Sequence, residues 1–221
     1  MSCLRAFTLP DSRIMATAVK ICGITRVEDA LVAAHAGANA IGMIFYAGSS
    51  RLVAHDVARR VVDALPAFVT PVALFVDAGA IEVERVVREV KPQLLQFHGD
   101  ETPEFCTSFG MPYIKAAKVR PGVDLLQYAR RYPTAKGLLL DAFVDGSQGG
   151  TGSTFDWALI PDQLPLPLIL AGGLHQGNVA DAIRRVRPWA VDVSSGVEAS
   201  KGIKDAAKIA AFIRGARNAD V

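Results

Sequence analysis

Hydrophobic residues along this chain gather in short clusters that alternate with amphipathic segments from residue 18 almost to the C-terminus. Eight of these clusters break at Gly, Pro or a charge, which is typical of strands buried on both faces. The predicted strands are residues 19–22, 40–45, 71–76, 94–97, 112–116, 138–141, 168–171 and 190–193.

Segments with helical periodicity separate the predicted strands. In residues 81–90, for example, positions 83, 86, 87 and 90 are apolar and form one helix face. We expect Thr25 to cap the first helix, with Glu28 completing a capping box, and Gly37 to end it. The predicted helices are residues 27–36, 56–65, 81–90, 103–109, 123–132, 155–160, 178–186 and 205–214.

Strand and helix patterns that alternate without a break in composition predict parallel strands covered by helices. Eight such units favour an α/β fold of the TIM (β/α)8-barrel type, formed as a single catalytic domain by residues 18–221. An open doubly wound sheet is the alternative, but the first strand is followed by Gly23-Ile24-Thr25 and not by a GxGxxG turn. Residues 1–17 are expected to form a loose N-terminal extension.

Composition excludes several classes of protein. With 221 residues, 51% hydrophobic and 21% charged, the chain can bury a sizeable core and is neither disordered nor a coiled coil. The mean hydropathy of +0.27 is high. No apolar run approaches the roughly 18 residues that span a bilayer, however, and no continuous apolar segment of a signal peptide occurs near the start. We therefore expect no membrane partner.

Charge and cysteine usage narrow the partners further. The net charge is +2 and basic residues are scattered, so no nucleic-acid partner is expected. Residues 184–187, Arg-Arg-Val-Arg, end a helical pattern, where the helix dipole favours cations. Three cysteines, Cys3, Cys22 and Cys106, lack any CxxC spacing. This pattern argues against a disulfide framework or a zinc site and indicates a cytoplasmic location.

Reactive side chains recur where the predicted strands end, which is where (β/α)8 barrels carry their chemistry. They are Cys22, Arg51, Asp77, His98, Lys115, Lys118, Asp141 and Asp192. Small residues follow the last two strands, at Gly172 and Gly173 and again at Ser194, Ser195 and Gly196. Without bulky side chains, backbone N–H groups can approach a phosphate closely. One such loop would only indicate a tight turn, but two neighbouring loops favour phosphate binding.

A third Gly-rich segment, residues 145–153, lacks the GK[ST] ending of a nucleotide-binding P-loop. It is either a loop that closes over the site or an ordinary surface loop.

Five segments, in order along the chain, resemble motifs of the phosphoribosylanthranilate isomerase family. They are residues 20–25 (Lys-Ile-Cys-Gly-Ile-Thr), 96–101 (Gln-Phe-His-Gly-Asp-Glu), Asp141 with 149–152 and 155–157, 170–174 (Leu-Ala-Gly-Gly-Leu) and 191–198 (Val-Asp-Val-Ser-Ser-Gly-Val-Glu). The likeness extends from residue 19 to about 212. One departure is small: residues 49–51 are Ser-Ser-Arg where the family usually has Ser-Pro-Arg.

The resemblance implies an Amadori rearrangement in tryptophan biosynthesis, from N-(5-phosphoribosyl)anthranilate to 1-(o-carboxyphenylamino)-1-deoxyribulose 5-phosphate. It implies that Cys22 is the general base and Asp141 the general acid. Arg51 would pair with the anthranilate carboxylate, His98 would line the anthranilate side, and Asp192 would contact a ribose hydroxyl. The partner would be this small phosphosugar–anthranilate substrate, with no cofactor and no metal, and the chain would be a monomer or homodimer.

Both catalytic residues need a tuned pKa. A free thiol has a pKa near 8.5, so a positive environment should help Cys22, whereas Asp141 must hold a proton that burial or a nearby anion would retain. Without the resemblance, Cys22 could be a small core residue and Asp141 a capping carboxylate.

Three other functions are alternatives. The related isomerase of histidine biosynthesis resembles an enzyme with two aspartates as acid and base, so Cys22 at the end of the first strand argues against it. Indole-glycerol-phosphate synthase has a catalytic lysine at the position that Cys22 occupies here, which argues against that enzyme too. A non-catalytic phosphosugar-binding module would need neither Cys22 nor Asp141.

Overall fold

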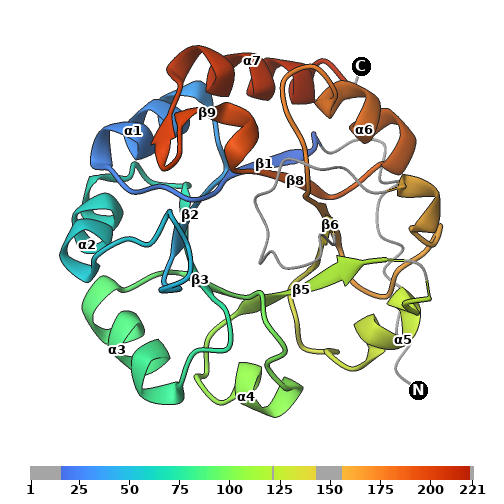
Figure 1. Cartoon of the computed structure of the whole chain (residues 1–221), viewed down its shortest axis with the longest axis horizontal. Helices are drawn as coiled ribbons and strands as arrows, with labels where there is room; N and C mark the ends of the chain where they lie inside the picture. The colour runs from blue at the N-terminus through green and yellow to red at the C-terminus, as the bar shows by residue number, and fades with distance from the viewer. Residues whose placement is uncertain (1–15, 121, 143–155, 220–221) are drawn as a thin grey trace, which may run out of the picture.

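The computed structural model describes residues 16–120, 122–142 and 156–219, and its eight main strands close into a barrel. Each strand pairs in parallel with the next along the chain, and β8 closes the ring against β1. Figure 1 looks down the barrel and shows the helices as an outer ring around the strands. The predicted TIM (β/α)8 barrel is confirmed, and the open doubly wound sheet is excluded.

The strands lie close to the eight hydrophobic clusters of the sequence. The largest difference is at β5, which ends at Val119 and so continues beyond the predicted strand 112–116. The barrel strands are β1 (Ala18–Ile21), β2 (Ala40–Ile44), β3 (Thr70–Phe75), β4 (Leu94–Phe97), β5 (Tyr113–Val119), β6 (Leu138–Ala142), β7 (Leu168–Leu170) and β8 (Ala190–Val193).

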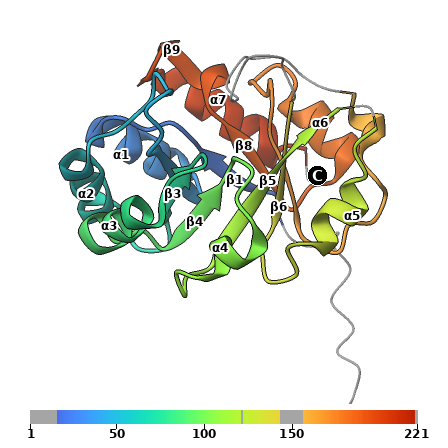
Figure 2. The same ribbon diagram turned by 60° about the horizontal axis from the view of Figure 1, so that its bottom comes forward.

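Helices follow most strands as predicted. They are α1 (Val27–Ala36), α2 (His55–Ala64), α3 (Ala80–Val90), α4 (Pro103–Thr107), α5 (Leu125–Arg130), α6 (Val179–Val186) and α7 (Ala206–Arg217). After β8 come the 3-10 turn η3 (Ser195–Val197) and a short hairpin of β9 (Glu198–Ser200) and β10 (Ile203–Lys204). In the side view, β9 lies at the end of the barrel toward which the β5 arrow points (Figure 2).

The predicted helix at residues 155–160 is wrong over its described part. The structure has only the 3-10 turn η2 (Trp157–Leu159), whose first turn is capped by the Asp156 carboxylate. Ile160 is already extended, with φ −82° and ψ 123°. Because residue 161 is a proline, the residue before it is disfavoured in the helical conformation, and the helix cannot continue.

The predicted capping box at the first helix is also wrong. Arg26, not Thr25, occupies the cap position of α1, and its side chain makes no capping hydrogen bond. Thr25 instead donates its hydroxyl hydrogen to the Gly202 carbonyl oxygen at 2.6 Å, which joins the end of β1 to the β9–β10 hairpin. The other end is as predicted, since Gly37 ends α1 with φ 102°.

Side chains alternate between the two faces of the barrel wall because successive residues of a strand point in opposite directions. Residues such as Val19, Ile21 and Val191 point outward and join the large core beneath the helices. Inside the barrel, a smaller apolar cluster comprises Ile114, Ala116, Leu139, Ile169, Ala171 and Ala190. The buried polar side chains Lys20, Gln96 and Asp192 occupy the inward-facing positions of β1, β4 and β8.

Two predictions fall largely outside the described residues. They are the N-terminal extension, of which residues 1–15 are not described, and the Gly-rich loop 145–153. Both stay predictions.

Candidate active site

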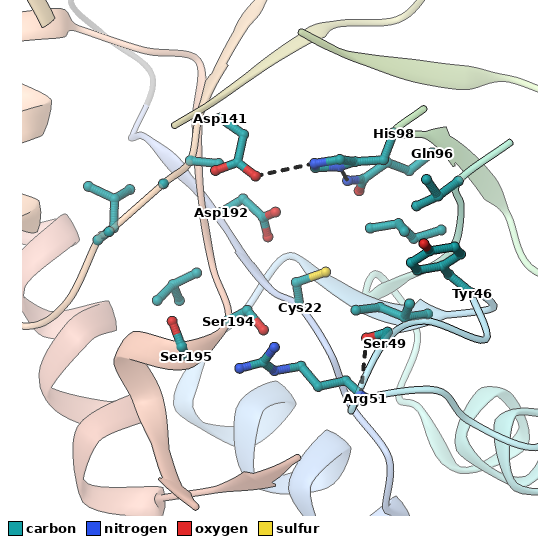
Figure 3. A pocket seen from close by; sticks show the side chains of 18 residues that line it. Cys22, Tyr46, Ser49, Arg51, Gln96, His98, Asp141, Asp192, Ser194 and Ser195 are labelled. Carbon is teal, nitrogen blue, oxygen red and sulfur yellow. Dashed lines mark hydrogen bonds and ion pairs between the residues drawn. The ribbon is translucent and has the colours of Figure 1, made fainter. Parts of the chain in front are cut away.

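A pocket opens at the C-terminal ends of the barrel strands (Figure 3). Its described lining comes from every barrel strand except β5, or from the loop that follows the strand. Of the ten site residues predicted from the sequence, the lining includes Cys22, Arg51, His98, Asp141, Gly172, Gly173, Asp192, Ser194 and Ser195. Gly196 lies behind the lining, where it supports the loop after β8. The fold therefore brings the predicted chemistry to one place.

Cys22 shares its side of the pocket with a buried ion pair. Lys20 and Asp192 are register partners on β1 and β8, and the Lys20 Nζ atom lies 2.9 Å from an Asp192 carboxylate oxygen. The same ammonium lies near the Cys22 thiol, since both groups border the position of Gly42. Gly42 on β2 makes room for this group, because a Cβ there would lie 2.7 Å from Cys22 Sγ and 2.9 Å from Lys20 Nζ.

Burial raises the pKa of the Cys22 thiol above its ordinary value, and the Lys20 ammonium only partly offsets this effect. Asp192 raises the pKa of the same thiol further, while the charge of Lys204 lowers it. The pKa of Lys20 itself is lowered by burial, but Asp192 and Cys22 more than compensate and raise it to about 12. Lys20 is therefore a cation at neutral pH.

Asp141 lies across the pocket at the end of a hydrogen-bonded chain (Figure 3). One of its carboxylate oxygens accepts from the backbone N–H of Ala142 at 2.9 Å, and the other lies 3.2 Å from His98 Nε2. The Nδ1 atom of His98 in turn lies 3.0 Å from the amide nitrogen of Gln96. The Gln96 side-chain oxygen is buried without a hydrogen-bond partner among the described residues.

Arg51 makes a two-point ion pair with Glu198, the first residue of β9. Its Nε and one Nη atom donate to the two carboxylate oxygens at 2.7 and 2.8 Å. Lys204 of β10 also donates to Glu198, at 2.9 Å. Burial alone raises the pKa of Glu198, but the two cations outweigh it and hold that pKa below its ordinary value. The sequence analysis predicts that Arg51 pairs with a substrate carboxylate. The Nε edge of its guanidinium is occupied by Glu198, whereas no second acidic side chain among the described residues pairs with the edge formed by the two Nη atoms.

The loops after β7 and β8 pack backbone against backbone. Gly172 has φ +81°, and a Cβ there would lie 2.6 Å from the Ala142 nitrogen and 2.9 Å from an Asp141 carboxylate oxygen. A Cβ on Gly196 would lie 1.9 Å from the Leu174 carbonyl oxygen. Both positions therefore require glycine: Gly172 lets the loop after β7 approach β6, and Gly196 lets the loops after β7 and β8 meet.

Three polar residues predicted at strand ends, Asp77, Lys115 and Lys118, lie outside the pocket lining. Lys115 points to the outer side of the wall, where its ammonium donates to the Glu101 carboxylate at 3.1 Å and to the carbonyl of Gly99 at 2.5 Å. One Asp77 carboxylate oxygen accepts from the backbone N–H of Asp100 at 2.6 Å. The side chains of Lys115 and Asp77 stabilise the loops after β3 and β4.

Sequence reasoning missed several pocket or supporting residues, namely Lys20, Gln96, Glu198, Lys204 and Tyr46. Lys20 and Gln96 each lie two residues before a predicted site residue, so strand alternation alone places them on the same face as Cys22 and His98. That signal could have found them. Glu198 lies at the end of the 191–198 motif, but no role was assigned to it, and Lys204 gave no signal because no strand was predicted after residue 193.

Within the described residues, no group of three or more His, Cys, Asp or Glu side chains is arranged to hold a metal ion. The described helices include none that is long and apolar enough to span a bilayer.

A family model described as N-(5′-phosphoribosyl)anthranilate isomerase matches residues 19–215 of the chain. An N-(5′-phosphoribosyl)anthranilate isomerase of Nitrosospira multiformis is 61% identical over 201 residues, which cover 91% of this chain and 97% of the relative. These matches span nearly the whole described barrel.

Solved structures agree with the sequence relatives. The phosphoribosylanthranilate isomerase of Thermotoga maritima superimposes with a TM-score of 0.84 at 40% identity and covers 91% of this chain and 99% of its own. A second such isomerase was solved in complex with reduced 1-(o-carboxyphenylamino)-1-deoxyribulose 5-phosphate. It has a TM-score of 0.81 and 39% identity, over 91% of this chain and 99% of that one.

Proposed function

The chain belongs to the N-(5′-phosphoribosyl)anthranilate isomerase family, and we propose that it isomerises its substrate with Cys22 as general base and Asp141 as general acid. The reaction is the Amadori rearrangement of N-(5-phosphoribosyl)anthranilate to 1-(o-carboxyphenylamino)-1-deoxyribulose 5-phosphate in tryptophan biosynthesis. The observation that carries the two assignments is that a thiol and a carboxyl group face one pocket from opposite sides, beside two glycine- and serine-rich loops.

The first step opens the furanose ring. Asp141 donates a proton to the ring oxygen, the C1′–O bond breaks, and the anilino nitrogen supplies the electron pair that forms a Schiff base. An acid in this position must carry a proton before the substrate reacts. One carboxylate oxygen of Asp141 already accepts from the Ala142 N–H, so the proton belongs on the oxygen that faces His98 Nε2.

Gln96 can support the protonated form of Asp141. If Asp141 donates to His98 Nε2, the imidazole proton lies on Nδ1 and requires an acceptor. The buried Gln96 side-chain oxygen, which has no partner among the described residues, becomes that acceptor when the amide is turned over. His98 would then accept from Asp141 and donate to Gln96, which is a more specific role than lining the anthranilate side.

The second step removes the C2′ proton. The Cys22 thiolate accepts it, and the electron pair of the C2′–H bond forms the enolamine. Return of that proton at C1′ and loss of the C2′ hydroxyl proton, which restores the proton that Asp141 gave to the ring oxygen, then yield the aminoketose. Each proton removed is returned, so the reaction needs no oxidant, reductant or cofactor.

Binding residues complete the proposal. The phosphate would be held by Gly172, Gly173, Ser194 and Ser195, with Gly196 keeping the two loops in contact. The Nη edge of Arg51 would receive the anthranilate carboxylate while Glu198 keeps the other edge. Asp192 would contact a ribose hydroxyl through the carboxylate oxygen that Lys20 leaves unoccupied.

The test is loss of substrate fluorescence, with N-(5-phosphoribosyl)anthranilate generated in situ. Cys22→Ser and Asp141→Asn should each reduce kcat by several orders of magnitude. Cys106→Ser is the matched control, because Cys106 is buried in the outer core, where burial raises its pKa to about 12. It should keep most of the activity.

Two outcomes would contradict the proposal. An inactive wild-type protein that still binds a product analogue would be a phosphosugar-binding module. Turnover that survives Asp141→Asn would require another general acid in an active isomerase.

The partner is a small molecule. A cytoplasmic location and a monomeric or homodimeric state belong to the same proposal, and sedimentation measures the latter.

A further inference from the structure

We propose that Lys20 is a positioning residue for Cys22: its ammonium stabilises the thiolate that removes the C2′ proton, and Asp192 opposes this effect. The inference rests on the proposed role of Cys22 and adds a residue through which the protein controls the charge of that base.

The geometry places the three groups in one buried cluster. Lys20 lies on β1 and Cys22 directly follows that strand, two residues later, so both side chains point to the pocket side of the barrel wall. Asp192 faces them from β8 as the register partner of Lys20, with 2.9 Å between the charged atoms. Only the absence of a side chain at Gly42 lets the ammonium and the thiol occupy adjacent positions.

A count of charges shows why each neighbour matters. With Lys20 positive, Asp192 negative and Cys22 neutral, the cluster has no net charge, and ionising the thiol brings it to −1. Without Lys20, the same ionisation would take the buried cluster from −1 to −2. Without the Asp192 charge, it would go from +1 to 0. Because charge is costly in a buried site, these three ionisations differ in free energy.

Other charged groups around Cys22 do not change the order of these three ionisation free energies. Lys204 of β10 lowers the pKa of the thiol, and the Arg51 guanidinium also interacts with the Cys22 charge. Both cations are held by Glu198, so they form a second cluster whose charge stays the same in variants of Lys20 and Asp192.

A purely structural role for the pair makes a different prediction. If Lys20 and Asp192 only stabilised the barrel, replacing either one would loosen the packing around Cys22. The reactivity of the Cys22 thiol would then change in the same direction in both variants. If they act through charge, Lys20→Met must suppress the thiolate and Asp192→Asn must promote it. The opposite signs are the distinguishing feature.

The experiment measures alkylation of Cys22 by iodoacetamide at about pH 8, followed by mass spectrometry of the Cys22 peptide, because the thiolate is the reacting form. Lys20→Met should slow alkylation about threefold or more, and Asp192→Asn should accelerate it by a similar factor. Lys20→Arg keeps the charge and should recover most of the rate. Lys115→Met, which removes another fully buried lysine on the outer side of the wall, should leave the rate unchanged.

A second measurement connects the thiol to turnover. The kcat/KM of wild type should rise with pH as Cys22 ionises, and in Lys20→Met this rise should move to higher pH.

The proposal is overturned if both substitutions change the alkylation rate in the same direction, or if Asp192→Asn leaves it unchanged. Should Lys20→Met fail to fold, Asp192→Asn decides alone, since Asn has nearly the same shape as Asp. Alkylation requires no turnover, so its result is independent of whether Cys22→Ser abolishes isomerase activity.

Discussion

Two lysines of the barrel wall are almost equally buried and serve different purposes. Lys20 on β1 points inward, pairs with Asp192 and lies near the Cys22 thiol at the pocket. Lys115 on β5 points outward, pairs with Glu101 and donates to backbone carbonyls after β4. Residue type and burial therefore do not define function. What differs is the face of the strand, because one face lines the reaction site and the other lies under the helices.

The outer lysine gives the largest expected effect. Lys115→Met leaves the Glu101 carboxylate buried without its cation, and we expect a loss of about 3–5 kcal/mol in the free energy of unfolding. Adding Glu101→Gln removes the unpaired charge while keeping an acceptor for the Asp77 N–H, so stability should largely return. Urea unfolding measures both changes.

The inner pair provides the contrast. Lys20→Met with Asp192→Asn should likewise unfold with near-wild-type free energy, yet its isomerase activity should fall because the Asp192 carboxylate that would contact a ribose hydroxyl is lost. The outer double variant should keep most of its activity. Equal losses of activity in the two double variants would refute the functional distinction between the faces.

An alkaline titration sharpens the comparison with a smaller effect. Burial alone lowers the pKa of Lys20, but Asp192 and Cys22 raise it from 10.5 to about 12. A raised lysine pKa stabilises the folded state below the unfolded value and loses that effect as pH rises through the folded value. The stability of wild type relative to the inner double variant should therefore decline by about 2 kcal/mol between about pH 10.5 and 12. A difference that stays constant over this range would contradict the assignment.

Solvent-exposed ion pairs should contribute least to the free energy of unfolding. Arg185 and Asp181 lie one turn apart on α6, 2.9 Å from each other, and both are exposed. Arg185→Ala should change the free energy of unfolding by no more than about 0.5 kcal/mol, because water screens the pair. A thermal or urea unfolding curve checks this, and a loss of 2 kcal/mol or more would show that burial is not what separates the three pairs.

Much of the fold could be predicted because hydrophobic periodicity is a local signal. The eight clusters coincide with the eight strands, and Gly37 ends α1 as expected. Local signals failed where a distant partner competed. Thr25 has the residue type and position of a helix cap, but its hydroxyl is bonded to the Gly202 carbonyl, 177 residues away.

In the candidate site, too, some features could be predicted from local sequence and others depend on distant partners. Cys22, Arg51 and Asp141 could be named from motifs, and all three line the pocket. Their pairing could not, since Glu198 is 147 residues from Arg51, and the pair forms only because the hairpin after β8 lies against the loop after β2. The Gln96–His98–Asp141 chain likewise joins two strands that are not neighbours in the barrel.

The sequence by itself determined that this chain forms a barrel of alternating strands and helices, with a thiol and a carboxyl group at the strand ends. Only the tertiary structure decided which carboxylate pairs with Lys20 and which edge of Arg51 is paired with Glu198. The physical reason is separation along the chain. A hydrophobic pattern can be recognised among residues that are close in sequence, whereas the charged partners come from distant segments that meet only in the closed barrel. Lys20 and Asp192 are 172 residues apart and meet only because β8 closes against β1.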